Sequence, residues 1–265
     1  MAVLLIDGLN LIRRIHAGVP DAAKDRDDGV LTACVASARR ALRRHHPSHV
    51  ILVMEGQELS WRSLEYPDYK KDRVGMPEDL RANLPAILAA LAGIGVNALS
   101  AQGFEADDLI GSIAARTATK GVSVVILSTD KSFCQLVCDH IAVHDHFNDV
   151  AHDSLWIRDR FGVEPVQLVD LFSLAGDPSL GLPGIRSVGV HTAARLLHDY
   201  GGLDGVIKAA PQIAGKLGEK LRAGLDGIPL TRRLVTLRQD VDLGANLHDF
   251  RWLPSMTHDT RGSSS

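Results

Sequence analysis

Three carboxylates in this 265-residue chain stand just after short apolar runs: Asp7, Glu55 and Asp130. The segment Glu105-Ala106-Asp107-Asp108 adds further acids near the start of a helical pattern. Acids at a helix N-terminus also have a purely structural explanation, because they cap the helix and interact favourably with its dipole. Strand-end aspartates likewise form turns. If all these carboxylates lie together, however, they repel one another strongly unless a cation lies among them.

The chemistry of such a group follows from its ligand atoms. Carboxylate oxygens without a set of His or Cys partners favour Mg²⁺ or Mn²⁺ over zinc. A bound metal of this kind neutralises a phosphodiester and lowers the pKa of its water, which then attacks phosphorus. The residues alone therefore predict a metal-dependent phosphoryl hydrolase.

The sequence predicts alternating strands and helices, an α/β fold, to position these acids. Strands are predicted at Val3–Ile6, Val50–Val53, Val122–Leu127 and Ile141–Val143, with a weaker one at Val96–Leu99. Helices are predicted near 29–45, 77–93 and 106–120, where apolar residues recur at three- and four-residue steps. Strands separated by helices indicate a parallel sheet covered on both faces. In an open parallel sheet the carboxyl ends of the strands meet at one edge, so the acids are expected to converge there.

The pattern divides the chain into three parts. Residues 1–164 form the predicted α/β core, interrupted at 56–76 by a polar and aromatic segment of the kind that forms active-site lids. Residues 165–245 are predicted as short helices near 165–175, 191–199, 203–209, 212–223 and 229–238. The polar stretch 246–265 is predicted to be a flexible tail.

The composition sets limits on location and partners. The formal net charge of −3 argues against a chain coated in basic surface, yet the basic residues fall in runs, so DNA is not excluded as a partner. No apolar stretch is long enough to span a membrane, and the N-terminal run reads as a strand rather than a signal peptide. The three cysteines are expected to be small buried residues in a reducing compartment. We expect a cytoplasmic protein.

Several motifs follow one another in order between residue 3 and about residue 240: Leu5-Ile6-Asp7-Gly8 with Arg14, Tyr69-Lys70 with Arg73 and Met76-Pro77-Glu78-Asp79, Glu105-Ala106-Asp107-Asp108, Ser128-Thr129-Asp130-Lys131, Leu174-Ala175-Gly176-Asp177 and Leu182-Pro183-Gly184-Ile185. Together they resemble the flap endonuclease (5′→3′ exonuclease) family, best known as the 5′ nuclease of DNA polymerase I. The chain is most similar to the stand-alone exonuclease IX type. The resemblance implies a PIN/resolvase-like nuclease core, a helical arch over 56–76 and a C-terminal helix-hairpin-helix region.

The resemblance also implies roles for individual side chains. It assigns a first metal site to Asp7, Asp107 and Asp108, with Glu105 acting directly or through water and Glu55 in place of the usual Asp. Asp130 and Asp177 match second-site ligands, whereas Ser132 and Leu180 occupy places that hold Asp in two-metal enzymes. A second ion is therefore expected to be weakly held, with reduced catalysis. Lys70, Arg73 and Arg14 are the implied catalytic cations at the scissile phosphate.

The helical region is implied to grip DNA phosphates through backbone N–H groups, independently of base sequence. The implied DNA-binding positions are Gly184, Ser187, Val188, Gly189, Val190, His191 and Thr192. Ser187 replaces a usual Gly and His191 a usual Lys, which lowers the expected phosphate affinity. The exonuclease IX type also binds K⁺ through main-chain carbonyls, here those of Leu174, Ala175, Pro183, Ile185 and Val188. Without this context, these are core apolar residues.

The preferred hypothesis is a monomeric, Mg²⁺-dependent flap endonuclease that removes displaced 5′ flaps from branched DNA in lagging-strand replication and repair. Ser132 and Leu180 motivate an alternative, a structure-specific DNA-binding protein with weak or no nuclease activity. A third hypothesis is a small RNA nuclease of the PIN type, which needs neither the arch nor the helix-hairpin-helix. Trp61, Tyr66 and Tyr69 either stack DNA bases or anchor the loop by packing.

Overall fold

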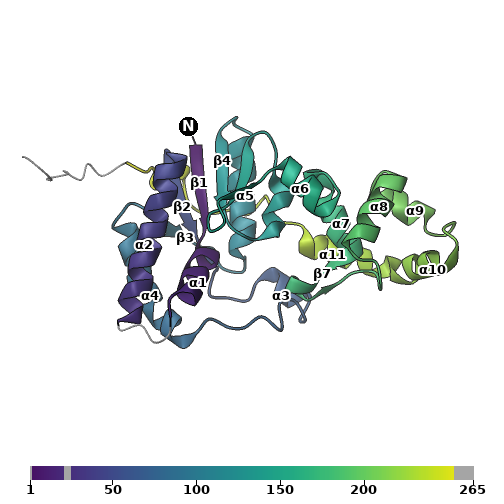
Figure 1. Ribbon diagram of the computed structural model, residues 1–265, viewed down its shortest axis with the longest axis horizontal. Coiled ribbons are helices and arrows are strands. Elements are labelled where there is room, and N and C mark those ends of the chain that lie inside the picture. The colour runs from purple at the N-terminus through teal and green to yellow at the C-terminus, as the bar shows by residue number, and fades with distance from the viewer. Residues whose placement is uncertain (1, 21–24, 254–265) are drawn as a thin grey trace, which may run out of the picture.

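The computed structural model describes residues 2–20 and 25–253. A mixed, mostly parallel sheet forms the centre of the α/β part, at the left of Figure 1, and the helical part extends to the right. The strands of the sheet are β1 Ala2–Asp7, β2 His49–Val53, β3 Asn97–Leu99, β4 Ser123–Leu127, β5 Ile141–Asp145 and β6 Val150–His152. Within the described ranges they pair in the order β3-β2-β1-β4-β5-β6, and only β6 runs antiparallel. The predicted parallel sheet is confirmed; β6, a three-residue edge strand, was not predicted.

Helices cover both faces of this sheet because the strand residues point alternately to each side. Helices α1 Gly8–Gly18, α2 Arg26–His45 and α4 Glu78–Ala92 pack with Leu4 and Ile6 on one face. Helix α5 Ala106–Ala118 packs with Val3 and Leu5 on the other. The helices expected near 29–45, 77–93 and 106–120 are thus present. Helix α1 was not predicted, because it starts directly at the end of β1 with Asp7 as its N-cap.

The second half of the chain is helical. The helices predicted after residue 165 are present, whereas a helix at Ser154–Phe161, inside the predicted 1–164 core, was not predicted. The α-helices of this half are α6 Ser154–Phe161, α7 Leu168–Ala175, α8 Val190–Tyr200, α9 Leu203–Ala209, α10 Gly215–Gly224 and α11 Ile228–Val235. The strands β7 Gly176–Asp177 and β8 Leu182–Pro183 pair antiparallel in a small second sheet. Short 3-10 helices occupy Lys131–Leu136, Pro165–Gln167, Pro178–Leu180, Leu225–Gly227 and Leu247–Phe250. Apolar residues of both halves belong to one buried cluster, which extends from Val3 to Phe250. The helical part therefore shares a continuous core with the α/β part.

The segment 56–76 crosses from the sheet to the helical part, and α3 lies on this path below the body of the molecule (Figure 1). It contains one short helix, α3 Trp61–Glu65, followed by turns and extended chain. The N–H of Lys70 donates to the carbonyl of Leu180 at 2.9 Å, and Tyr69 is buried against Leu182 and Leu234. The predicted arch is therefore mostly non-helical, and it is docked on the helical part.

The prediction of a flexible tail from residue 246 is wrong for residues 246–253, whereas its remainder, 254–265, lies outside the described residues. Phe250 is buried, and Trp252 donates from its backbone N–H to Ser48 and from its indole to the carbonyl of Ile94. These contacts fasten the chain beside β2. Across 2–20 and 25–253, none of the helices combines the length and apolarity needed to cross a membrane.

Candidate active site

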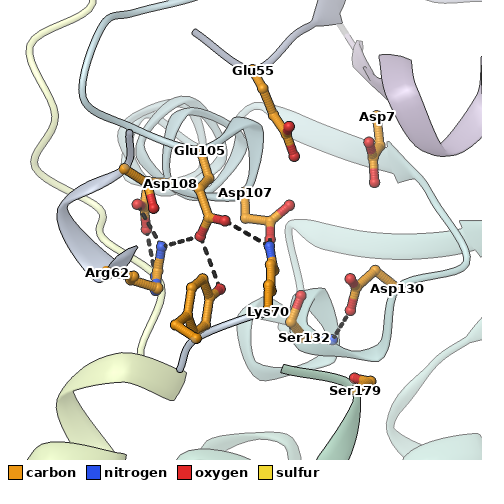
Figure 2. A network of polar contacts seen from close by, with 12 residues as sticks. Asp7, Glu55, Arg62, Lys70, Glu105, Asp107, Asp108, Asp130, Ser132 and Ser179 are labelled. Atoms are coloured by element: carbon orange, nitrogen blue, oxygen red, sulfur yellow. Dashed lines mark hydrogen bonds and ion pairs between the residues drawn. The ribbon is translucent and has the colours of Figure 1, made fainter. Parts of the chain in front are cut away.

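Acidic side chains meet at the carboxyl edge of the sheet, as the sequence predicts. Asp7 ends β1, Glu55 follows β2 and Asp130 follows β4, while Asp107 stands in the first turn of α5. Figure 2 shows these four carboxylates directed toward a common space. Their charges act on one another: those of Asp130 and Glu55 both raise the pKa of Asp7. The topology thus brings together acids that are far apart in the sequence.

Asp7 is the most firmly held of these acids. The hydroxyl of Ser128 donates to its Oδ2 at 2.7 Å, and the N–H of Asn10 donates to Oδ1 at 3.2 Å. Burial raises the pKa of Asp7 to about 6, against the lowering effect of the Ser128 hydrogen bond. Burial likewise raises the pKa of Asp107, although the ammonium of Lys70 opposes that shift. Both carboxylates therefore lie where an additional cation would be stabilising.

Lys70 supplies part of the positive charge that this cluster needs. Its Nζ lies 2.6 Å from Oε1 of Glu105 and 3.8 Å from Oδ2 of Asp107. Although burial works against the charged amine, the carboxylates of Asp107 and Glu105 raise the pKa of Lys70. The backbone of Lys70 has a φ of 53°, a left-handed conformation that is uncommon for a non-glycine residue. The arch segment thus places a cation among the acids at the cost of local strain.

Glu105 faces cations rather than open solvent. Its Oε2 accepts hydrogen bonds from the Tyr69 hydroxyl and from Arg62 Nη1, both at 2.9 Å, and Oε1 accepts from Lys70. Burial alone would raise the pKa of Glu105, but the charges of Lys70 and Arg62 hold it below its usual value. Glu105 is therefore ionised and held in place by three donors.

Asp108 does not join the other acids, contrary to the metal-ligand role that the resemblance implies. Its side chain is 0% exposed and turned toward Arg62, away from the common space (Figure 2). Oδ1 accepts from Arg62 Nη2 and from the N–H of Arg238, and Oδ2 accepts from Arg62 Nη1 and the Trp61 indole. Each oxygen of Asp108 thus accepts two hydrogen bonds from the protein, so the side chain stabilises the fold and is not placed to bind a metal.

Arg62 is the site residue that the sequence did not single out. It is buried between Glu105 and Asp108, and no feature of its sequence neighbourhood separates it from the other arginines of the chain. The one available signal is charge balance, because a crowded set of acids requires buried cations. Trp61 packs against Arg62, with the guanidinium carbon 4.5 Å from the ring centroid, and Arg238 lies 5.0 Å from the same ring. Trp61 and the buried Tyr69 are therefore packing anchors in this structure.

The other predicted catalytic cations lie at the border of the cluster. Nη1 of Arg73 is 3.8 Å from Oε1 of Glu55, and both side chains are partly exposed. Arg14 donates to the Thr129 hydroxyl at 3.2 Å, and its guanidinium lies over the ring of Phe147. Asn10 donates to the same hydroxyl at 2.9 Å. Arg14 is thus anchored beside the Asp130 loop, without an ion pair to the acids at the present distances.

The predicted second metal position lies in a neighbouring cleft of about 600 Å³, lined by Asp130 and Asp177. Asp130 accepts from the N–H of Ser132 at 2.8 Å, and Asp177 accepts from the N–H and hydroxyl of Ser179. Figure 2 places Ser132 and Ser179 close to Asp130. In the described part of the chain, the buried Ser132 hydroxyl has no hydrogen-bond partner. Leu180 packs near Tyr69 and contributes only its carbonyl, to Lys70.

The predicted DNA-binding turn is tightly built. A Cβ on Gly184 would lie 2.1 Å from the carbonyl carbon of Ala175, so only glycine fits there. Ser187 adopts a φ of 62°, in the region that favours glycine. The N-cap of α8 is Gly189, which provides no side-chain hydrogen bond to the first turn. Gly189 and His191 are exposed at the start of α8, and the first N–H groups of a helix have no acceptor within the helix itself.

The carbonyls predicted for K⁺ surround the same turn. That of Leu174 accepts from the N–H of Ile185, that of Ile185 from the N–H of Val188, and that of Pro183 from the hydroxyl of Thr231. A carbonyl oxygen has two lone pairs, so these hydrogen bonds leave capacity for an ion. Three of the five carbonyls predicted for K⁺ are therefore already used in internal hydrogen bonds.

The sequence matches two family models along almost its whole length. Residues 2–162 match the N-terminal resolvase-like domain of the 5′-3′ exonucleases, and residues 163–258 match their C-terminal SAM-fold domain. The chain belongs to the 5′-3′ exonuclease family. Its predicted division at residues 164/165 lies close to the boundary between the two matches.

Curated relatives agree with this membership, and a solved structure shares the fold. The exonuclease is 42% identical over 249 residues to a protein named flap endonuclease Xni from Shewanella sp. (strain ANA-3), covering 94% of each chain. It is 39% identical to the protein of the same name from Aeromonas salmonicida (strain A449), covering 96% of this chain and 97% of that one. Its fold is similar to the bacteriophage T5 5′-exonuclease with bound zinc ions, with a TM-score of 0.77, 17% identity and 89% of each chain covered.

The donor set of this exonuclease fits a hard divalent cation, although its side chains are not yet closed around one. Within residues 2–20 and 25–253, no group of three His, Cys, Asp or Glu side chains stands close enough to hold an ion. The atoms that face the common space are carboxylate oxygens, the ligands that Mg²⁺ prefers. Burial, and then the charge of Asp130, raises the pKa values of Asp7 and Asp107, so a cation placed there would stabilise their charged forms. Of these acids, Glu105 and Asp107 are paired with Lys70, and a bound metal would compete with its ammonium for their oxygens.

Proposed function

We propose that this exonuclease is a structure-specific 5′-flap endonuclease, which hydrolyses a phosphodiester of branched DNA with Mg²⁺, or Mn²⁺ as a substitute. The observation that carries the proposal is the convergence of Asp7, Glu55, Asp107 and Asp130 on one edge of the sheet beside Lys70. Flap removal in lagging-strand replication and repair is the corresponding biological role. This substrate agrees with the cytoplasmic location predicted from the sequence.

The proposed first metal site consists of Asp7 and Asp107, with Glu55 and Glu105 as direct or water-mediated partners. Asp130 and Asp177 are the proposed second-site ligands, and Ser132 lies beside Asp130, to which its N–H donates. When bound, the metal neutralises the phosphodiester and supplies an activated water. We leave Asp108 out of the ligand set because four donors already occupy its carboxylate.

The cations of the arch segment are proposed to act on the scissile phosphate. Lys70 lies between Glu105 and Asp107, so a phosphate that enters with its metal meets an ammonium at the reaction centre. Arg73, half-exposed beside Glu55, is proposed to turn toward a phosphate of the 5′ single strand of the flap. Arg14, fixed on the Thr129 hydroxyl, is proposed to bind a neighbouring phosphate of the same strand.

The duplex of the substrate is proposed to bind the turn before α8. Gly184, Ser187, Val188 and Gly189 form the turn, and Val190, His191 and Thr192 form the start of the helix. K⁺ is proposed to bind the carbonyls of Leu174, Ala175, Pro183, Ile185 and Val188 and to rigidify the turn. We propose a monomer for this role, because one chain contains both the acids and the phosphate-binding turn.

One observation supports the alternative of a DNA-binding protein with weak nuclease activity. Leu180, in the place of a second-site carboxylate, packs with apolar neighbours and cannot ligate a metal through its side chain. The second ion therefore depends on Asp130, Asp177 and hydroxyl or water ligands. This alternative predicts junction binding that persists after chelation and no product in Mg²⁺.

The deciding experiment uses a 5′-labelled flap duplex, Mg²⁺ and K⁺, with an EDTA control. We compare the natural protein with Asp107→Asn and with a matched control, Asp139→Asn, whose exposed side chain lies near the amino end of β5 at the opposite edge of the sheet. The proposal expects Mg²⁺-dependent cleavage near the junction that Asp107→Asn abolishes and Asp139→Asn retains. Tight flap binding without cleavage in Mg²⁺ or in Mn²⁺ would establish the alternative.

A further inference from the structure

Arg62 is the most completely bonded charged side chain of the site. It is 1% exposed, and each of its five N–H groups has an acceptor. Nε donates to the carbonyl of Leu234 at 2.8 Å, and Nη2 donates to the carbonyl of Thr236 at 2.9 Å. The remaining N–H groups bind Asp108 through both oxygens, at 2.7 Å each, and Glu105 at 2.9 Å. Isolated burial of this charge would be very unfavourable, so the full set of partners is required.

These partners belong to three different parts of the molecule. Arg62 itself lies in α3 of the arch segment, Glu105 and Asp108 lie at the start of α5, and Leu234 and Thr236 lie at the end of α11. Charges alternate along the contacts, from Asp108 through Arg62 to Glu105 and then through Lys70 to Asp107 (Figure 2). This series of alternating charges begins beside α11 in the helical half and ends at the acids of the sheet edge.

We propose that Arg62 is a positioning residue, which fixes Glu105, and through it Lys70, relative to the end of α11. This inference rests on the proposed function of the same site. Glu105 can present Oε1 to Lys70 because Arg62 and Tyr69 hold Oε2. The carbonyls of Leu234 and Thr236 fix the other edge of the guanidinium, so the helical half determines where that carboxylate points. DNA bound to the helical half is thereby aligned with the cation at the acids.

A lysine at this position would keep the charge but lose the alignment. Its ammonium is a single point with three donors, whereas the guanidinium is a rigid fork that bridges two carboxylates and two carbonyls at once. Arg62→Lys therefore separates positioning from charge. Arg233→Lys is the matched control, since Arg233 also joins α11 to the arch segment, through Glu65, but is 62% exposed and has no contact with Glu105.

The first measurement is steady-state cleavage of the 5′-flap duplex in Mg²⁺ by the full chain. We expect Arg62→Lys to lower kcat by about tenfold or more, with KM within about threefold of the natural value, because misplacement affects the chemical step rather than DNA binding. Arg233→Lys should retain kcat within about twofold. If Arg62→Lys lowers the unfolding temperature but retains the natural kcat well below that temperature, Arg62 only supports the fold and the proposal is overturned.

A second measurement is independent of cleavage. The rate of reductive methylation of Lys70, followed by mass spectrometry in the metal-free protein, should rise at least about threefold in Arg62→Lys, because Glu105 no longer holds the amine. Arg233→Lys should leave this rate unchanged. An unchanged rate in Arg62→Lys contradicts the positioning role. If the natural protein cleaves no flap in Mg²⁺ or Mn²⁺, the proposed function is wrong, and the Lys70 rate still decides the role of Arg62.

If Arg62→Lys does not fold, Asp108→Asn tests the same link. It keeps the side-chain volume and the guanidinium but weakens the ion pair that orients Arg62. The expected result is again faster methylation of Lys70 than in the natural protein. A rate equal to that of the natural protein would contradict the proposed link, because the pair of Asp108 with Arg62 would then have no effect on how Glu105 holds Lys70.

Discussion

At the scale of single residues, Asp107 and Asp108 show how adjacent carboxylates acquire opposite tasks. Asp107 faces the other acids and Lys70, whereas Asp108 is turned into the protein and bonded to Arg62. The helical periodicity separates two adjacent residues by roughly 100° around the axis, so they cannot face the same ligand. One acid is available to a metal, and its neighbour neutralises a buried arginine.

This difference predicts different losses on removal of each charge. Asp107→Asn should abolish flap cleavage while leaving stability unchanged or slightly higher, because it relieves repulsion among the acids. Asp108→Asn should lower the free energy of unfolding by about 3–5 kcal/mol, because it leaves Arg62 as a poorly compensated buried charge. Urea unfolding and flap cleavage measure the two effects. Equal stability losses in the two variants would contradict this assignment.

Ser187 gives a second prediction at this scale. Its φ of 62° costs a non-glycine residue about 1–2 kcal/mol, and replacement by Gly removes that strain but increases the entropy of the unfolded chain. Ser187→Gly should therefore raise the free energy of unfolding by about 0.5 kcal/mol. Gly184→Ala is the contrasting variant, since its Cβ would overlap the backbone of Ala175 and should destabilise the turn by several kcal/mol. Thermal unfolding tests both, and a destabilised Ser187→Gly protein would contradict the strain argument.

At the scale of elements, α2 and β5 meet through a cluster of histidines. His45, near the end of α2, lies edge-on to His144 of β5 with ring centroids 5.1 Å apart. His146 accepts a hydrogen bond from Arg40 of α2. Burial lowers the pKa of both His45 and His146 to about 4, and the charges of Arg44 and Arg40 act in the same direction, partly offset by Asp149. This contact is therefore built for neutral imidazoles.

The sign of the resulting pH dependence is fixed. An unfolded histidine binds a proton below about pH 6.5, whereas these folded ones remain neutral until about pH 4, so their contribution to stability falls as the pH drops through that window. Asp7, whose pKa is raised to about 6, acts in the opposite direction. We therefore compare variants. Between pH 7 and pH 5, the free energy of unfolding of the double variant His45→Gln with His146→Gln should fall by about 2 kcal/mol less than that of the natural protein.

Urea unfolding at the two pH values provides this comparison. His198→Gln is the control, because the ring of His198 is exposed on α8. It should show the same loss as the natural protein. An identical pH dependence in the double variant would mean that these rings are protonated in the folded state.

At the scale of the whole molecule, the two halves share one core, and the chain returns to the sheet at its described end. The helical half contributes to the same buried cluster as β1 and α5, so the acids and the turn proposed to bind DNA belong to one body. Residues 246–253 then pass back beside β2, where Phe250 is buried and Trp252 bonds to Ile94. This return closes the structure around the sheet.

The closing segment predicts a stability effect far from the site. Phe250→Ala should lower the free energy of unfolding by about 3 kcal/mol, because it leaves a cavity against the core. Leu253→Ala, a nearby residue that is 70% exposed, should change it by less than about 0.5 kcal/mol. Denaturant unfolding compares the two. If Phe250→Ala were as stable as Leu253→Ala, the segment would not be part of the cooperative fold.

The sequence by itself determined the sheet, most helices, the convergence of the strand-end acids and the family. Parallel strands with carboxylates at their ends leave few alternatives, because the topology of such a sheet places those ends together. Residues such as Asp7 and Asp130 could therefore be assigned to one edge from their positions alone.

Only the tertiary structure decided which acids face which partners. The role of Asp108 depends on Arg62, which lies in another segment, and on the N–H of Arg238, from beyond α11. The packing of residues 246–253 depends on a surface of the sheet that local polarity does not reveal. Hydrophobic periodicity and motif spacing describe one segment at a time, whereas the burial of a charge or a tail is decided by contacts between segments that folding alone brings together.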